Sequence, residues 1–582
     1  LLDEVPPERI LCLTYTKAAA MEMQNRLFGR LGKWAMRPED DLRSALADVG
    51  VPPERLTPEL LSRARTLFAR AIETPGGLKI QTIHSFCASV LRRFPLEAGV
   101  SPGFTEIDER VQGRLIADLL DDLAEDPARS GAIDAVVPYL GDEDGIMKLA
   151  RDVAGKAEAF DPPLGWDSVC AAMGIDPGLD EAGVLSAVLT GEERAICDAV
   201  WPHLDPEGKQ QAKPHRILRD MPWEAMTLDA LAELEEVCLT GDKTKTPFAA
   251  KGQSIGNKSV RDAIGPDAME AFAALTERVE AARPLRTGLL NARKTHALHV
   301  FATAFLPAYA AAKTERGWLD FDDLIGRTRQ LLRAPDIAQW VLFRLDGGID
   351  HILVDEAQDT SPAQWDIVKR LAEDFAAGEG ARTDVNRTIF VVGDKKQSIY
   401  SFQGADPEGF DRMRDHFDDR LKGAGLPLQE ADLLYSFRSA RPILDLVDTV
   451  CGPERPTQVG GHLEHKAFFA ERPGRVDLWP VVPPAPSGED LAWCDPQDLL
   501  GAEHHFAVLA QTLADRLHAM LHDERPEIET EDGPRPVEAG DILILVRRRS
   551  PLFRQIIAAL KGKDLPIAGV DRSALTAPLA VQ

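Results

Sequence analysis

The segment HILVDE, residues 351–356, is an apolar run that stops abruptly at two adjacent carboxylates, Asp355 and Glu356. The segment TIFVVGD at 388–394 has the same form and ends at Asp394. Short apolar runs bounded in this way are typical of buried strands. Ligands gather at the carboxyl ends of strands in open α/β sheets, so we expect both acidic ends to face one crevice.

Two more strand candidates lie in the first hundred residues, ILCLTYT at 10–16 and LKIQT at 78–82. Thr16 can cap a helix that follows the first of them. Each run precedes apolar residues at helical spacing: Ala20, Met23, Leu27 and Leu31 in one case, and Ile83, Phe86, Val90 and Phe94 in the other. A strand followed by a helix, twice, predicts an α/β fold with a parallel sheet.

The length of 582 residues is too great for a single core and indicates three or four domains. We expect an α/β region at 1–105 that resumes at 311–430, a mostly helical insertion at 106–310, and a second α/β region at 431–582. The clearest strand of that last region is DILILVRRR at 541–549. The insertion carries apolar stripes at helical spacing, formed by Leu115, Leu119 and Leu123, and by Leu298, Phe301, Phe305, Tyr309 and Ala312.

Composition narrows the class of protein. Apolar residues make up 44% and charged residues 28%, as in soluble globular proteins, and no apolar run approaches the ~18 residues of a membrane span. The seven cysteines are scattered without a CxxC pair, which predicts a reduced, cytoplasmic protein without a cysteine metal site. The net charge of -27 disfavours nucleic-acid binding without excluding it, because a groove presents only its local charge. The segment 241–259 is a candidate basic loop, either solvated or in contact with a phosphate backbone.

Adjacent carboxylates at a rigid strand end suit nucleotide hydrolysis, since one can organise Mg²⁺ and the other can orient the attacking water. A bare Asp-Glu pair is more often a solvated turn, but here VVGDKKQSIYSFQGADP follows at 391–407. Gln397 of that segment can hydrogen-bond a phosphate oxygen. Tyr400 and Phe402 can stack on unpaired bases, although isolated aromatic residues more often belong to a core.

A third segment, LLYSFRSARPIL at 433–444, adds a cation and a ring. Arg438 could reach a terminal phosphate as an arginine finger, and Phe437 beside it could stack on a purine. The tripeptide FRS on its own carries little information.

Together and in this order, these segments resemble the superfamily 1 helicases of the UvrD/RecB type. DEAQDT resembles motif II of that family, GDKKQSIYSFQGAD motif III and YSFRS motif IV. LTYTKAAAMEMQNRL (13–27) is similar to motif Ia, QTIHSFCASVLRRF (81–94) to motif Ib, and LDFDDLI (319–325) to a recurrent segment of the family. Within the family the resemblance is strongest to the AddA-type subunits of the bacterial helicase-nucleases of double-strand break repair.

The resemblance implies RecA-like parallel-sheet motor domains. The first would comprise 1–105 and 311–430, with the helical insertion at 106–310, and the second would begin within 431–582. It also implies an ATP-dependent DNA helicase or translocase that moves 3'-5' in break repair and recombination. ATP and Mg²⁺ would be its cofactors, DNA single strands and duplex ends its substrates, and an AddB-like subunit its partner.

The resemblance assigns roles residue by residue. Asp355 would hold magnesium and Glu356 would position the hydrolytic water. Gln397 would sense the γ-phosphate, Arg438 would neutralise charge in the transition state, and Phe437 would pack on the adenine. The single-strand path would be lined by Tyr15, Thr16, Lys17, Thr82, His84, Tyr400 and Phe402. Without its place in the motif, His84 would more often be a core histidine.

The sequence departs from the family pattern in two places. Gln403 stands where many relatives carry arginine, which puts a charged contact in doubt. No GxxxxGK[ST] loop is present, and we expect that loop before Leu1, in a longer enzyme of which this chain is an internal piece that is inactive alone. A free-standing UvrD-like repair helicase and a non-catalytic DNA-binding or assembly module remain as alternatives.

Overall fold

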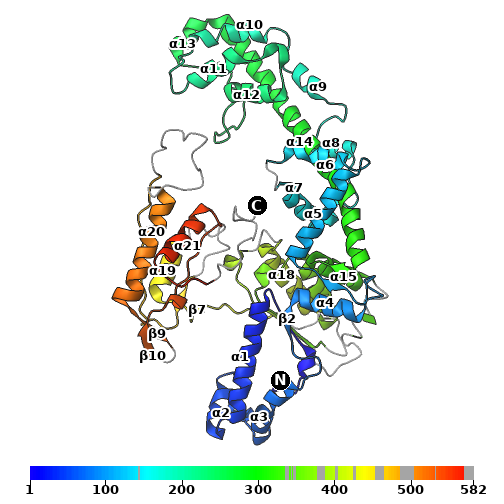
Figure 1. Cartoon of the computed structure of the whole chain (residues 1–582), viewed down its shortest axis with the longest axis vertical. Coiled ribbons are helices and arrows are strands. Elements are labelled where there is room, and N and C mark those ends of the chain that lie inside the picture. Colours follow the sequence, from blue (N-terminus) through cyan, green and yellow to red (C-terminus); the bar gives the residue numbers. More distant parts are fainter. Residues whose placement is uncertain are drawn as a thin grey trace. The chain divides into compact units, whose positions relative to one another are not determined.

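The computed structural model divides into two compact units, Leu1–Ala431 and Asp432–Gln582, each with its own apolar core (Figure 1). The structure describes residues 1–141, 145–334, 340–341, 344, 349–376, 387–399, 404–423, 428–452, 464–484, 504–530 and 533–568.

A parallel sheet forms the centre of the first unit, with the strand order β2-β1-β5-β6. In the register, Leu13 lies opposite Val354, and Val354 lies opposite Val391. The two segments that end in carboxylates are therefore neighbours in the sheet. This confirms the predicted α/β class and the parallel pairing. The strands are β1 (Ile10–Thr14), β2 (Lys79–Thr82), β5 (His351–Val354) and β6 (Thr388–Val391).

Helices follow the first two strands as predicted. The apolar face of α4 (Ile83–Arg93) is buried in the same core as Leu11 and Ile352 of the sheet. The long helix α1 (Lys17–Met36) packs against α2 (Glu39–Ala47) and α3 (Pro58–Ile72) around a separate apolar cluster that includes Leu31 and Trp34.

The helical insertion leaves and rejoins the first unit at one place. Its entry strand β3 (Thr105–Glu106) pairs in parallel with its exit strand β4 (Trp318–Leu319). The segment between them is helical, as expected. Its α-helices are α5 (Glu109–Glu125), α6 (Gly131–Val136), α7 (Gly145–Ala154), α8 (Trp166–Met173), α9 (Glu181–Ser186), α10 (Glu193–Asp198), α11 (Ala212–Asp220), α12 (Leu228–Cys238), α13 (Lys258–Ile264) and α14 (Pro266–Arg316).

Helix α14 is 51 residues long and supports two apolar cores (Figure 1). Near its start, Phe272 and Leu275 pack in a core with α8 to α12. Near its end, Phe301, Phe305 and Tyr309 stack in series and pack in a second core with α5, α6 and α7. The stripe predicted at 298–312 is therefore the buried face of this helix, because residues three and four apart lie on the same side.

The basic loop at 241–259 is only partly solvated. Lys243 and Lys245 are exposed, but Lys251 packs against α12, where its Nζ donates to the carbonyl oxygens of Glu236 and Val237 at 2.9 Å each. A lysine at the end of a helix satisfies carbonyls that have no partner within it. Lys251 is thereby committed to the fold.

Three helices complete the first unit: α15 (Phe321–Arg333), α17 (Pro362–Leu371) and α18 (Pro407–Gly423). Ser361 caps α17 in a capping box with Gln364, and Trp365 and Val368 are buried against the sheet core. The predicted start of this helix at Ser361 is confirmed.

The second unit contains the short parallel pair β7 (Tyr435–Ser436) and β8 (Lys466–Ala467) and the antiparallel pair β9 (Glu527–Thr530) and β10 (Gly533–Pro536). Its α-helices in the described residues are α19 (Arg441–Val450), α20 (His505–His518) and α21 (Pro551–Gly562), of which α20 and α21 form the core.

The strand predicted at 541–549 was wrong. Residues 542–546 do alternate between half-buried and exposed side chains, as in a strand, and Leu543 and Leu545 are 78% and 81% exposed. No described segment pairs with them in a ladder. Extended backbone becomes a strand only with a hydrogen-bonded neighbour, which the local pattern cannot supply.

Within the described residues, no helix is long and apolar enough to cross a membrane. Cys12, Cys87, Cys170, Cys197, Cys238 and Cys451 are free thiols, as predicted for a reduced protein. Cys494 lies outside the described residues.

Candidate functional site

The turn after β5 places its two carboxylates differently. Asp355 is half-buried and its N–H donates to the carbonyl of Leu13 at 2.9 Å, which continues the sheet for one residue. Glu356 is exposed and has left-handed backbone angles, φ 53° and ψ 44°. Such angles cost a non-glycine residue about 1–3 kcal/mol, and residues held in this way cluster at functional sites. Burial, and next the charge of Glu356, raise the pKa of Asp355.

Gln358, one of the most buried polar residues at 1% exposure, joins the two acidic strand ends. Its Oε1 accepts from the Asp394 N–H at 2.9 Å, and its Nε2 donates to Glu356 Oε2 at 2.7 Å. The N–H of Asp394 can only donate, so it fixes which end of the Gln358 amide faces Glu356. We had assigned no role to this residue. The available signal was a polar side chain in a turn flanked by buried strands.

Gly393 makes this contact possible. A Cβ atom built on it would lie 2.7 Å from Gln358 Oε1, 3.1 Å from the Ala357 nitrogen and 3.2 Å from the Ala357 Cβ. The end of β6 therefore approaches the turn after β5 as closely as backbone allows, which explains the glycine before Asp394.

Asp359 is a third carboxylate of this turn. It is buried, its Oδ1 atom has no hydrogen-bond partner in the described structure, and its pKa is raised by burial and next by the charge of Glu356. No lysine or arginine of the described residues pairs with Asp355 or Glu356. This end of the sheet therefore carries uncompensated negative charge.

The site suits magnesium that arrives with a nucleotide better than a resident ion. No group of three or more potential metal ligands is found among the described residues. Mg²⁺ is usually held by one or two carboxylates together with phosphate oxygens and water, and Asp355 with its raised pKa is a hard oxygen ligand of this kind.

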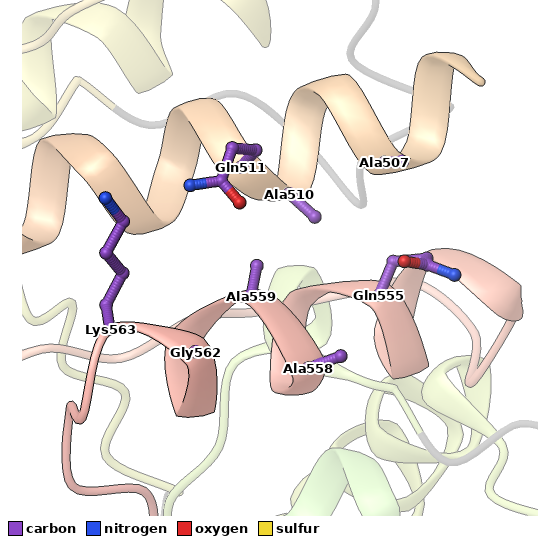
Figure 2. Close-up of a pocket in the computed structure, with 8 residues that line it drawn as sticks. All are labelled: Ala507, Ala510, Gln511, Gln555, Ala558, Ala559, Gly562 and Lys563. Carbon is purple, nitrogen blue, oxygen red and sulfur yellow. The ribbon is translucent and has the colours of Figure 1, made fainter. Parts of the chain in front are cut away.

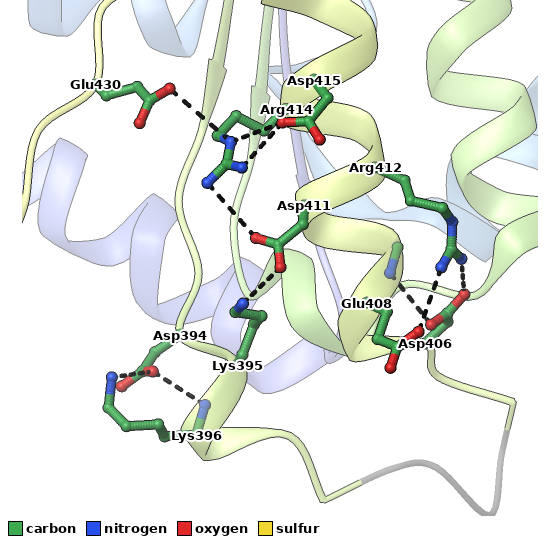
Figure 3. A network of polar contacts seen from close by, with 11 residues as sticks. Asp394, Lys395, Lys396, Asp406, Glu408, Asp411, Arg412, Arg414, Asp415 and Glu430 are labelled. Atoms are coloured by element: carbon green, nitrogen blue, oxygen red, sulfur yellow. Dashed lines mark hydrogen bonds and ion pairs between the residues drawn. The ribbon is translucent and has the colours of Figure 1, made fainter. Parts of the chain in front are cut away.

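The segment after β6 is fixed by ion pairs. Figure 3 shows Lys395 Nζ on Asp411 of α18 at 2.6 Å and Lys396 Nζ on Asp394 at 2.9 Å. Gln397 is exposed, and its Nε2 donates to Asp394 Oδ2 at 3.0 Å. Burial would raise the pKa of Asp394, but the hydrogen bonds from Lys396 and Gln397 outweigh it and lower that pKa. Both lysines of this segment are therefore already paired.

The structure thus brings Glu356 and Gln397 into one hydrogen-bonded chain, which runs from Glu356 through Gln358 and Asp394 to Gln397. Arg438 and Phe437 belong to the second unit. Both are exposed at the end of β7, and no carboxylate of the described residues pairs with Arg438.

The residues assigned to the single-strand path divide into three groups. Thr16 and Thr82 are helix caps: Thr16 Oγ1 accepts from the Ala19 N–H at 3.1 Å, and Thr82 Oγ1 from the Ser85 N–H at 3.2 Å. Tyr15 is half-buried and Lys17 is exposed. Tyr400, Phe402 and also Gln403 lie outside the described residues.

His84 lies half-buried at the start of α4 beside an aromatic ring that we had not assigned. Its imidazole is 5.2 Å from the ring of Phe321, edge to face, and Phe321 is 40% exposed. Burial lowers the pKa of His84, so the imidazole is neutral near pH 7. The pair offers an uncharged aromatic surface beside the carboxyl end of β2.

A pocket of about 350 Å³ lies elsewhere, between α20 and α21 in the second unit (Figure 2). Most of its lining is small, and Lys563 is paired with Asp515 at 2.6 Å. None of the residues to which we assigned a role lines it. The lining residues are Ala507, Ala510, Gln511, Gln555, Ala558, Ala559, Gly562 and Lys563.

Comparison with known proteins agrees with this geometry. Residues 1–418 match the family described as UvrD/REP helicase N-terminal domain. The chain is 26% identical to the ATP-dependent helicase/nuclease subunit (AddA) of Exiguobacterium sibiricum and 25% identical to that of Bacillus mycoides, over 97% of this chain and 45% of each relative. It is 29% identical to that of Desulforudis audaxviator, over 77% of this chain and 36% of the relative. The chain thus spans about 45% of the length of the first two relatives, and it belongs to the UvrD/REP helicase family.

Proposed function

We propose that this chain forms the motor of an ATP-dependent DNA helicase that moves 3'-5' along one strand and acts in double-strand break repair within a helicase-nuclease. The helicase family and the relatives named as helicase/nuclease subunits support this proposal. An AddB-like partner subunit follows from the same relatives.

One observation carries the proposal: the hydrogen-bonded chain from Glu356 to Gln397 at the carboxyl ends of two adjacent parallel strands. In this proposal Glu356 orients the attacking water, and Gln397 senses the terminal phosphate. Because Gln358 and Asp394 connect them, a shift of Gln397 on phosphate binding is passed to the Glu356 carboxylate.

Asp355 would hold the magnesium of Mg-ATP, which supplies charge neutralisation to the phosphates when bound. Bound cation also removes the like-charge repulsion that raises the pKa of Asp355. In the second unit, Arg438 neutralises phosphate charge in the transition state and Phe437 packs on the adenine.

For the DNA strand we propose contacts from Tyr15, Lys17 and the His84–Phe321 pair, together with Tyr400 and Phe402. Stacking of a base on an aromatic side chain contributes about 1–3 kcal/mol per base without sequence preference. Thr16 and Thr82 are proposed to act through the N-termini of the helices that they cap.

The test is single-strand-stimulated ATPase activity of the intact protein that carries this chain. Glu356→Gln keeps the size of the side chain and removes the base, so we expect kcat to fall about 10²–10⁴-fold while ATP still binds. Glu408→Gln is the matched control, since its side chain is 91% exposed on α18. Equal activity of Glu356→Gln and the parent protein would contradict the assignment.

Direction is tested separately, with streptavidin bound to either end of a single strand. Movement 3'-5' displaces it from the 5' end and leaves it on the 3' end. Displacement from the 3' end alone would refute the proposed polarity and leave the ATPase assignment intact. DNA binding without any ATPase activity would favour a non-catalytic module.

A further inference from the structure

Two phenylalanines meet at the carboxyl ends of β7 and β8. The strands pair in parallel with Ser436 opposite Ala467, and the N–H of Phe468 donates to the carbonyl of Ser436 at 2.9 Å. Phe437 and Phe468 are therefore the first residues beyond two adjacent parallel strands. This is the edge at which α/β folds bind ligands.

The two rings lie nearly face to face and remain open to solvent. Their centroids are 4.3 Å apart with a tilt of 34°, and Phe437 and Phe468 are 61% and 53% exposed. Tyr435 and Phe469 contact Phe468 edge to face, at 6.3 and 5.0 Å. Phe468 is thus the central ring of an exposed aromatic cluster, and it covers only one face of Phe437.

A free cation stands beside these rings. Arg438 follows Phe437 directly and has no carboxylate partner among the described residues, whereas Arg441 lies 3.7 Å from Asp445 and Arg472 lies over the ring of Phe469 at 4.6 Å. An exposed flat apolar surface next to an unpaired guanidinium fits a ligand that has both a planar ring and an anionic group. A nucleotide has both.

We propose that Phe468 is a positioning residue for nucleotide binding: its ring supports the back of Phe437 and holds that ring at the angle at which its free face stacks on the base. This inference rests on the proposed role of Phe437 and extends it to a residue outside the recognised motifs. It makes Phe468 a determinant of preference for nucleotides over base-free polyphosphates.

The test measures ATP hydrolysis by the intact protein, with inorganic tripolyphosphate as a competing ligand that lacks a base. We expect Phe468→Ala to raise the KM for ATP about three- to tenfold, the range of one aromatic pair. The kcat should stay within about twofold, and the inhibition constant of tripolyphosphate should not change. Phe468→Tyr keeps the ring and should restore the parent KM.

Phe469→Ala is the matched control, because Phe469 is also exposed and touches Phe468 but has no ring contact with Phe437 among the described residues. Its KM should equal that of the parent protein. If Phe437→Ala raises KM and Phe468→Ala does not, this inference falls and the proposed function stands. If neither variant changes KM, the role of Phe437 in the proposed function falls too. An equal loss of tripolyphosphate affinity in Phe468→Ala would show that the residue supports the loop and not the base, which overturns the inference.

Discussion

Gln358 Nε2 donates a hydrogen bond of 2.7 Å to Glu356 Oε2, while the other end of the same amide accepts from the Asp394 N–H at 2.9 Å. The carboxylate of Glu356 is exposed but its orientation is set by a residue that is 1% exposed. A general base must face the water that it activates, so its orientation matters as much as its charge.

Gln358→Ala should therefore lower kcat of the ATPase about 10²-fold, since loss of positioning alone has effects of this size, while the KM for ATP changes little. Steady-state kinetics with saturating single-stranded DNA provides the measurement. Gln364→Ala is the control: Gln364 is also buried, but its side chain belongs to the capping box of α17. A kcat of Gln358→Ala equal to that of Gln364→Ala would refute the positioning role.

Gly393→Ala should displace Gln358, because the added Cβ would lie 2.7 Å from Gln358 Oε1 and 3.1 Å from the Ala357 nitrogen. Overpacking of this kind costs about 1–3 kcal/mol, and we expect both a lower Tm and a lower kcat. Gly326→Ala in α15 is the control, since no atom lies within 4 Å of its added Cβ. Its Tm should stay equal or rise, and a normal kcat for Gly393→Ala would show that Gln358 tolerates the shift.

Lys313 joins the end of α14 to the start of α15. Its buried Nζ donates to Asp320 at 2.7 Å and to Asp323 at 2.5 Å. Burial opposes ionisation of Asp320, but the Lys313 ammonium outweighs it and lowers the pKa of that carboxyl. Lys313→Met leaves two unpaired buried carboxylates and should destabilise the fold by about 3–5 kcal/mol, measured by thermal unfolding.

Lys422→Met removes a solvent-exposed pair with Asp418 and should leave the Tm nearly unchanged. If Lys313→Met and Lys422→Met melt together, the Lys313 pair contributes no net stability.

Asp322 gives a pH test whose sign follows from its pKa. Partial burial, and then the charges of Asp320 and Asp323, raise the pKa of Asp322 to about 6. The folded protein holds this proton more tightly than the unfolded chain, so stability from this group is full below the unfolded pKa and is lost as pH rises through 6. Asp322→Asn should thus raise the Tm at pH 8 more than at pH 4. Because the side chain remains partly exposed, the gain should be below about 1 kcal/mol. An equal change of Tm at both pH values would contradict the raised pKa.

The sequence by itself determined the local elements of this protein. Apolar periodicity located the strands at Ile10 and His351 and the stripe of α14 at Phe301, and side-chain oxygens located the helix starts at Thr16 and Ser361. These features depend on residues close together in the chain, so a pattern of a few residues is enough to reveal them.

Only the tertiary structure decided which distant residues meet. The bonds of Gln358 to Asp394, the clearance that Gly393 provides, and the contact of Phe437 with Phe468 all join segments that are about 30 residues apart or more. The segment at 541–549 shows the same limit, because its strand pattern found no partner in the described residues. Strand pairing and side-chain contact are settled by which surfaces the whole fold brings together, and no local pattern contains that information.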